Sequence, residues 1–273
     1  MPKYFLIVIS LCLAFQLNAQ STSLKKKAIS IGEQVEFHSD ILDENRLLNI
    51  YLPVGYSADS AKTYPVIYLL DGSLDEDFIH IVGLVQFGSF SWINLIPETI
   101  VVGISNVDRK RDFTYPTTNK QDKLDFPTTG GSANFIQFLE KEVQPLIAKN
   151  YKTNKSRTLI GQSLGGLLAT EILFKKPDLF ENFMIISPSL WWDDESLLKI
   201  EPKKFTSNKS IYVAVGKEGE IMERTATDLH HKLEKLDLKN TQLFFEYFEK
   251  FDHGDVLHMA VYRAFELIFA QQK

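Results

Sequence analysis

A serine lies between small residues in the segment Gly161-Gln162-Ser163-Leu164-Gly165. The segment follows the β-branched and apolar run 158–160 and precedes a helix-forming run at 167–174. Small residues at this spacing allow the sharp strand-to-helix turn that lifts a serine hydroxyl above a sheet. Because the bare pattern occurs by chance in roughly one chain in ten of this length, the hypothesis of a nucleophilic serine needs support from other residues.

An activated serine needs a base within reach and an acid that orients the base. When the serine lies on such a turn, the acid and the histidine follow it in that order along the chain. We expect His253 as the base, because it lies beside Gly254 in a short polar loop after the last predicted strand. We expect Glu218 as the acid, two residues beyond the strand predicted at 211–216. Glu220 is the alternative acid, although it is better placed to favour the dipole of the following helix.

Acyl transfer also needs amide donors for the developing oxyanion. One donor is expected to be the amide of Leu164, which directly follows the nucleophile and begins a helix. The other is expected in the loop 70–73 after the third predicted strand, where the Ser73 amide is preferred over that of Gly72. His80 follows the same loop and is a candidate for substrate contact.

Strands and helices alternate along the chain. Residues 33–38 and 47–53 predict an antiparallel hairpin with a turn at 43–45, and the apolar runs 65–70 and 99–104 predict strands that helices cover on both faces. Further strands are expected at 158–161, 183–187, 211–216 and 243–248, and helices at 132–150, 163–175, 221–236 and 256–269. Pro145 should kink or shorten the helix at 132–150. The pattern predicts an α/β fold with a mostly parallel central sheet and an antiparallel N-terminal hairpin.

Composition places the chain among ordinary globular enzymes. It has 273 residues, of which 44% are hydrophobic and 24% charged, so we expect a single α/β domain at 20–273. Residues 1–19 have the pattern of a signal peptide, with Lys3 before the apolar run 4–15 and Leu17-Asn18-Ala19 before the cleavage site. The run is too short for stable membrane insertion. We therefore expect export to the periplasm or the extracellular space.

The sole cysteine, Cys12, lies in the predicted signal peptide. The mature chain is then expected to have no thiol, which excludes disulfides, cysteine nucleophiles and cysteine metal sites. We expect neither a metal nor another cofactor. The formal net charge of -5 gives nucleic acid no electrostatic reason to bind. A small-molecule ester or a glycan ester is the expected partner.

Four segments together resemble the esterase D-like branch of the α/β-hydrolases, and they match most of the mature chain in the expected order. They are 64–72, 161–166, 187–192 and 252–254. The resemblance implies the α/β-hydrolase fold and serine esterase activity. The motifs are most similar to those of siderophore trilactone esterases of the enterobactin and bacillibactin type.

The segments 109–116 and 187–192 carry this closer resemblance. One interpretation is that Arg109 or Arg111 binds an anionic ligand and that Trp191 and Trp192 form a stacking wall. The other is that an arginine pairs with Asp112 to brace a loop, and that one tryptophan covers the core.

Three other functions stay open at this stage. The chain could be a feruloyl or acetyl-xylan esterase, it could transfer the acyl group to a sugar, or it could be a binding protein that keeps the hydrolase scaffold without turnover. A lid over the site is expected in 83–97 or 108–130.

Overall fold

The computed structural model describes residues 24–236 and 240–269, so the predicted signal peptide lies outside the described residues. Residues Ile31–Lys273 form one compact unit, built on an eight-stranded sheet in the order β1-β2-β4-β3-β5-β6-β7-β8. The strands are β1 (Glu33–Ser39), β2 (Glu44–Tyr51), β3 (Tyr64–Leu69), β4 (Ile100–Ile104), β5 (Thr153–Gln162), β6 (Asn182–Ile186), β7 (Lys209–Gly216) and β8 (Thr241–Phe248). Strands β1 and β2 are antiparallel to their neighbours, whereas β4, β3 and β5 to β8 run parallel.

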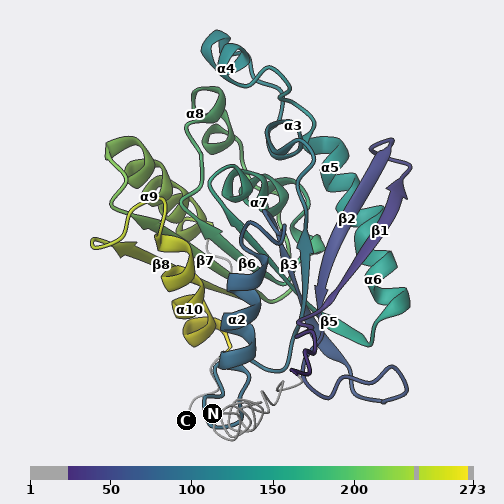
Figure 1. Ribbon diagram of the computed structural model, residues 1–273. Coiled ribbons are helices and arrows are strands. Elements are labelled where there is room, and N and C mark those ends of the chain that lie inside the picture. Colours follow the sequence, from purple (N-terminus) through teal and green to yellow (C-terminus); the bar gives the residue numbers. More distant parts are fainter. Residues whose placement is uncertain (1–23, 237–239, 270–273) are drawn as a thin grey trace, which may run out of the picture. The chain divides into compact units, whose positions relative to one another are not determined.

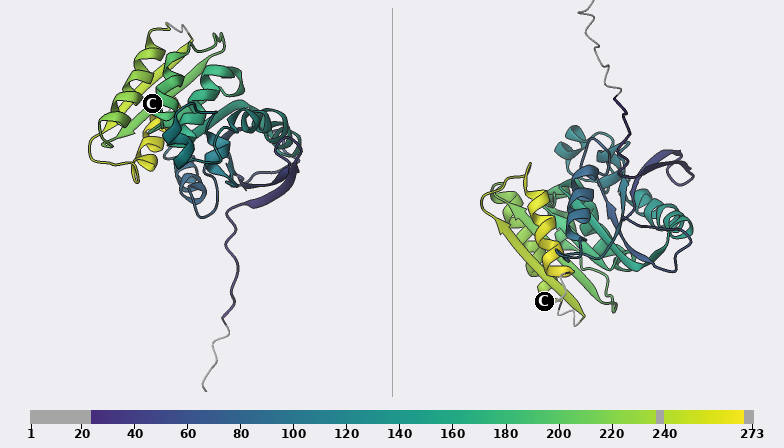
Figure 2. Two further views of the ribbon diagram at one scale, coloured as in Figure 1. Left: turned by 90° about the horizontal axis from the view of Figure 1, so that it is seen from above. Right: turned by 60° about the horizontal axis from the view of Figure 1, so that its bottom comes forward.

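Helices cover both faces of the sheet (Figure 1). Helices α2 (Phe78–Gly88) and α10 (Val256–Ile268) bury their apolar residues together on one face. The larger apolar cluster, on the other face, includes residues of α5 (Ser132–Phe138), α6 (Gln144–Asn150), α7 (Leu164–Lys175) and α9 (Glu220–Glu234). Figure 2 shows the same layers from two further directions. The expected α/β-hydrolase fold with an antiparallel N-terminal hairpin is confirmed.

The strand ends differ from the prediction by more than two residues in two places, at the start of β2 and at the start of β5. Glu44 and Asn45 already pair within the hairpin, so the turn occupies residues 40–43, and Asp43 has a φ of 52°. Strand β5 begins at Thr153 rather than at Thr158. Its first five residues are half-buried or exposed and mostly polar, so they lack the apolar run that marks a buried strand.

The predicted helix at 132–150 is interrupted. Between α5 and α6 the chain forms one π-helical turn, Leu139–Val143. Pro145 lies in the first turn of α6, where it has no N–H to donate to a carbonyl of the preceding turn. The wider π-helical turn accommodates the missing hydrogen bond, so the disruption expected at Pro145 takes the form of this turn.

Four helices were not predicted from the sequence: α2, α3 (Arg109–Phe113), α4 (Lys120–Asp125) and α8 (Trp192–Lys199). Residues 83–88 are the end of α2, in which Val85 and Gly88 are buried, so this part of 83–97 belongs to a packed helix. Segment 108–130 contains α3 and α4, which lie at the same end of the sheet as α8 (Figure 1). Among the described residues, no helix has the length and apolarity needed to cross a membrane.

Candidate active site

Ser163 lies at the turn between β5 and α7, with φ 60° and ψ -120°. A positive φ is strained for a residue with a side chain, so the surrounding structure must hold it. The Ser163 amide donates to the Ile186 carbonyl at 3.1 Å, and the Ser163 carbonyl accepts from the Ser189 amide at 3.0 Å. A Cβ atom on Gly161 would lie 2.4 Å from the Gly165 carbonyl oxygen, so only glycine fits there. The predicted sharp turn is therefore present and fixed by backbone bonds.

Glu218 and His253 meet beyond the ends of β7 and β8. The Nδ1 atom of His253 lies 2.5 Å from Oε2 of Glu218. The Glu218 side chain is only 2% exposed, whereas that of His253 is 47% exposed. The other oxygen of Glu218, Oε1, accepts from Ser187 Oγ at 2.5 Å and from the Gly216 amide at 2.9 Å. The carboxylate is thus held on both oxygens, and the imidazole is open to the surface.

The electrostatics of Glu218 favour its charged form. Burial acts against ionisation, but the hydrogen bonds from His253, Ser187 and the Gly216 amide together keep the pKa of Glu218 below its usual value. Glu220 is the first residue of α9, where its charge suits the helix dipole. Of the two glutamates considered from the sequence, the structure places Glu218 against His253.

The Ser163 hydroxyl has a different partner from the expected base. Its Oγ lies 3.3 Å from Oγ of Ser189, and within the described chain it makes no hydrogen bond to His253. The loop of His253 is nevertheless tied to the turn, because Gln162 Nε2 donates to the His253 carbonyl at 2.6 Å. Catalytic hydrogen bonds are often long or poorly aligned outside the Michaelis complex, so this geometry is compatible with His253 as the base.

The two expected oxyanion donors have different surroundings. The Leu164 amide is the first of α7, and such amides have no acceptor inside their own helix. The Ser73 amide donates a long bond of 3.3 Å to the carboxylate of Glu76. The Gly72 amide is used in a 3.0 Å bond to the Ile104 carbonyl, which agrees with the preference for Ser73. Of the two amides, that of Ser73 therefore has the weaker acceptor, and this acceptor is the exposed side chain of Glu76.

Arg109 connects the loop of Ser73 to the nucleophile turn. Its Nε and Nη2 donate to the two oxygens of Asp71 at 2.6 and 2.9 Å, and Nη2 also donates to the Gln162 carbonyl at 3.3 Å. Asn106 adds a 2.7 Å bond to Asp71. Arg109 therefore braces two loops beside Ser163, while a third of its side chain is exposed.

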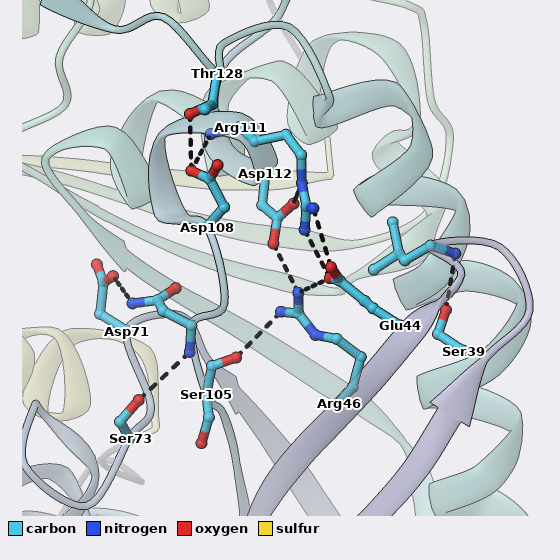
Figure 3. Close-up of polar contacts among 12 residues, drawn as sticks. Ser39, Glu44, Arg46, Asp71, Ser73, Ser105, Asp108, Arg111, Asp112 and Thr128 are labelled. Carbon is cyan, nitrogen blue, oxygen red and sulfur yellow. Dashed lines mark hydrogen bonds and ion pairs between the residues drawn. The ribbon is translucent and has the colours of Figure 1, made fainter.

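Arg111 points toward strand β2, as Figure 3 shows. It donates to both oxygens of Glu44 and, at 2.7 Å, to Asp112. The buried Arg46 contacts the same two carboxylates, each at 2.8 Å. This is the loop-bracing pair with Asp112 that was one of the two interpretations, and it leaves the guanidinium engaged away from Ser163.

The two tryptophans have different environments, which favours the interpretation in which one tryptophan covers the core. Trp192 is fully buried and donates from Nε1 to the Tyr115 carbonyl at 2.9 Å, so no ligand can stack on it. Trp191 is half-buried beside Phe126, with ring centroids 6.0 Å apart. Lys110 Nζ lies 4.7 Å from the centre of the Phe126 ring. Lys110, Phe126 and Trp191 together form a partly exposed aromatic and cationic surface.

His80 lies on α2 and contacts His258 of α10, with ring centroids 5.1 Å apart. Burial and the neighbouring His258 lower the pKa of His80. In the part of the chain that the structure describes, no three histidine, cysteine, aspartate or glutamate side chains cluster as a metal site would require.

The family described as "Putative esterase" matches residues 39–255, which include every residue of this site. The chain belongs to this esterase family. It is therefore a carboxylic-ester hydrolase. The matched region runs from the end of β1 to the residue before α10.

The chain is similar to named esterases and hydrolases in sequence and in structure. The chain is 30% identical to a ferri-bacillibactin esterase, BesA, of Bacillus subtilis, over 81% of this chain and 84% of that protein. It is similar in structure to an IroE-like serine hydrolase from Shewanella oneidensis, with a TM-score of 0.77 and 30% identity over 87% of this chain and 80% of that one. The BES protein from Bacillus cereus gives a TM-score of 0.76 and 30% identity, over 90% of this chain and 98% of that one.

Proposed function

We propose that the esterase acts through Ser163 as nucleophile, with His253 as the base and Glu218 as the acid that orients it. The observation that carries the proposal is the 2.5 Å contact between His253 Nδ1 and Glu218 Oε2. This contact fixes the ring and leaves Nε2 to accept a proton. The strained turn at Ser163, tied to the His253 loop through Gln162, supports the same assignment.

The reaction has two halves. His253 takes the Ser163 proton as Oγ attacks the ester carbonyl, and Glu218 stabilises the imidazolium. The amides of Leu164 and Ser73 donate to the oxyanion, and His253 then protonates the leaving alcohol. Water attacks the acyl-enzyme by the same route and releases the acid. For the Ser73 amide to take part, the Glu76 carboxylate rotates away from it.

The proposed substrate is a siderophore-type ester of the trilactone class. The names of the relatives support this class, since they include a ferri-bacillibactin esterase and an apo-salmochelin esterase. The surface formed by Lys110, Phe126 and Trp191 supports it chemically, because cations and aromatic rings suit anionic aryl groups. Trp191 lies two residues beyond Ser189, which contacts Ser163.

We also infer that the chain is exported after removal of residues 1–19, as the apolar run and its flanking residues indicate. N-terminal sequencing of protein recovered from the producing cell tests this inference. A mature chain that begins at Gln20 is expected, and one that retains Met1 contradicts it.

An ester panel tests the catalytic assignment and the substrate together. Purified wild-type protein and Ser163→Ala are compared on p-nitrophenyl acetate, a catecholate trilactone, and feruloyl and acetyl sugar esters. We expect trilactone turnover to be preferred and the variant to lose roughly a millionfold in kcat. Wild-type rates in Ser163→Ala would show that the nucleophile is wrong, and no trilactone preference would remove the siderophore substrate. A protein that binds the trilactone without turning over any ester would be a binding protein instead.

A further inference from the structure

The segment Ser187-Pro188-Ser189, here called the Ser-Pro-Ser bridge, follows β6 and contacts both ends of the proposed catalytic set. At one end, Ser187 Oγ donates to Glu218 Oε1 at 2.5 Å. At the other end, Ser189 Oγ lies 3.3 Å from Ser163 Oγ. Both serines are buried, at 0% and 2% exposure. One tripeptide therefore touches the proposed acid and the proposed nucleophile, which lie far apart in the sequence.

The backbone of the Ser-Pro-Ser bridge is fixed at each residue. The Ser187 amide donates to the Ala214 carbonyl at 2.7 Å, and the Ser189 amide donates to the Ser163 carbonyl at 3.0 Å. Pro188 packs so closely on α7 that a Cβ atom on Gly166 would lie 2.9 Å from its Cα. Proline also restricts its own φ. The two hydroxyls are thus held on a rigid element, as a precise site requires.

Ser187 carries backbone strain as well. Its φ of 43° lies in the left-handed region, which is unfavourable for a residue with a side chain. A glycine would remove that strain, and the chain has serine instead. Serine differs from glycine here in one respect, because its hydroxyl donates a hydrogen bond to Glu218.

We propose that Ser189 donates its hydroxyl to Ser163 Oγ during attack, as a catalytic residue, and that Ser187 positions Glu218 against His253. The proposal rests on the proposed function of Ser163. When Ser189 is the donor, the Ser163 proton is left to point toward His253. Negative charge grows on Ser163 Oγ as that proton leaves, so the bond from Ser189 strengthens as the reaction proceeds. Ser187 occupies Oε1, so Oε2 remains for the imidazole.

Paired variants of the purified full chain test the proposal. Ser189→Ala removes the donor, and Ser189→Cys keeps a weak donor of similar shape. Ser187→Ala and Ser187→Gly both remove the hydroxyl, but only glycine accepts the positive φ freely. Ser132→Ala is the matched control, because Ser132 is fully buried and its hydroxyl finds no partner among the described residues. Measurements are kcat and KM for p-nitrophenyl acetate, the rate of fluorophosphonate labelling, and thermal unfolding.

We expect Ser189→Ala to lower kcat and the labelling rate by about 10- to 100-fold, with KM little changed. Ser189→Cys should fall between Ser189→Ala and the wild type. Both Ser187 variants should lose kcat to a similar extent, although Ser187→Gly should be the more stable, and Ser132→Ala should keep wild-type rates.

A kcat within about twofold of wild type in both Ser189→Ala and Ser187→Gly, with Ser163→Ala inactive, overturns the bridge proposal and leaves the proposed function standing. A loss that vanishes when rates are expressed per folded molecule also overturns it. Activity in Ser163→Ala overturns the proposed function instead.

Discussion

Oε2 of Glu218 lies 2.5 Å from Nδ1 of His253, while Oε1 accepts hydrogen bonds from Ser187 Oγ and the Gly216 amide. The carboxylate is therefore oriented before any substrate arrives. The Ser163 hydroxyl takes no part in these hydrogen bonds and lies 3.3 Å from Oγ of Ser189. In the proposed mechanism, the acid and the base are therefore assembled in advance, and Ser163 joins them when its proton turns toward His253.

Removing the charge of Glu218 should impair turnover far more than removing that of Glu220. Glu218→Gln is expected to lower kcat by about 10³- to 10⁴-fold, because the amide offers the imidazole no anionic partner. Glu220→Gln should stay within about twofold, since a charge at a helix start affects stability by only about 0.3–1 kcal/mol. Steady-state kinetics on p-nitrophenyl acetate decide between them, and equal losses would show that the acid is misassigned.

Substitution of Arg109 should lower activity, whereas substitution of Arg111 should lower stability. Arg109→Lys is expected to lower kcat by about 10-fold or more, because lysine cannot hold both oxygens of Asp71 and the Gln162 carbonyl together. Arg111→Lys should leave kcat unchanged and lower the free energy of unfolding by about 1–2 kcal/mol. Kinetics and urea unfolding of both variants measure this. A kcat loss in Arg111→Lys alone would contradict the assignment of the brace to Arg109.

Asp77 should make stability depend on pH in the direction opposite to an ordinary ion-paired carboxylate. Burial, together with the negative charges of Asp71 and Glu76, raises the pKa of Asp77 to about 6. An unfolded aspartate titrates near pH 3.9, so the folded protein binds the proton more tightly. Stability from this group is present below pH 3.9 and is lost as the pH rises through 6.

Asp77→Asn should therefore raise the free energy of unfolding by about 1–3 kcal/mol at pH 8, with the gain shrinking toward zero near pH 4. Urea unfolding across this range is the measurement. Asp75→Asn is the control, because the neighbouring Asp75 is exposed and should change stability by less than about 0.5 kcal/mol. A gain in Asp77→Asn that is independent of pH would refute the account.

Trp191 and Trp192 should respond differently to the same change. Trp192→Phe removes a buried volume and the donor to the Tyr115 carbonyl, so we expect a loss of about 2–4 kcal/mol in stability. Trp191→Phe should cost less than about 1 kcal/mol and raise KM for aryl-acyl esters more than for acetyl esters. Thermal unfolding and KM for both ester types test the pair. An unchanged aryl-ester KM in Trp191→Phe would remove Trp191 from the substrate surface.

The sequence alone was enough to predict the strands of the sheet, and the expected acid and base, Glu218 and His253, lie in contact. Strands β3, β4, β6 and β7 are covered on both faces. Such strands have continuous apolar runs, which can be recognised in the sequence. The polar first half of β5 and the short helices α3, α4 and α8 carry no such pattern. Helix α2 has two glycines, and its His80 and Phe87 are exposed, so its apolar stripe is hard to recognise in the sequence.

The side chains that hold the site were not predictable in the same way. Gln162 occupies the variable position before Ser163 in the serine motif. Ser187 and Ser189 lie in a segment that resembles the esterase family, but the sequence assigns neither of them a role. Their contacts join residues 26 to 91 positions apart, so no local spacing reports them. The burial of Trp192 also depends on Tyr115, 77 positions earlier.

Fluorophosphonate labelling followed by peptide mapping tests the central claim most directly. The probe reacts with an activated serine and leaves a covalent adduct on it. We predict one adduct on wild-type protein, at Ser163, and none on Ser163→Ala. An adduct on Ser189 or elsewhere, or full esterase activity without any adduct, would contradict the account.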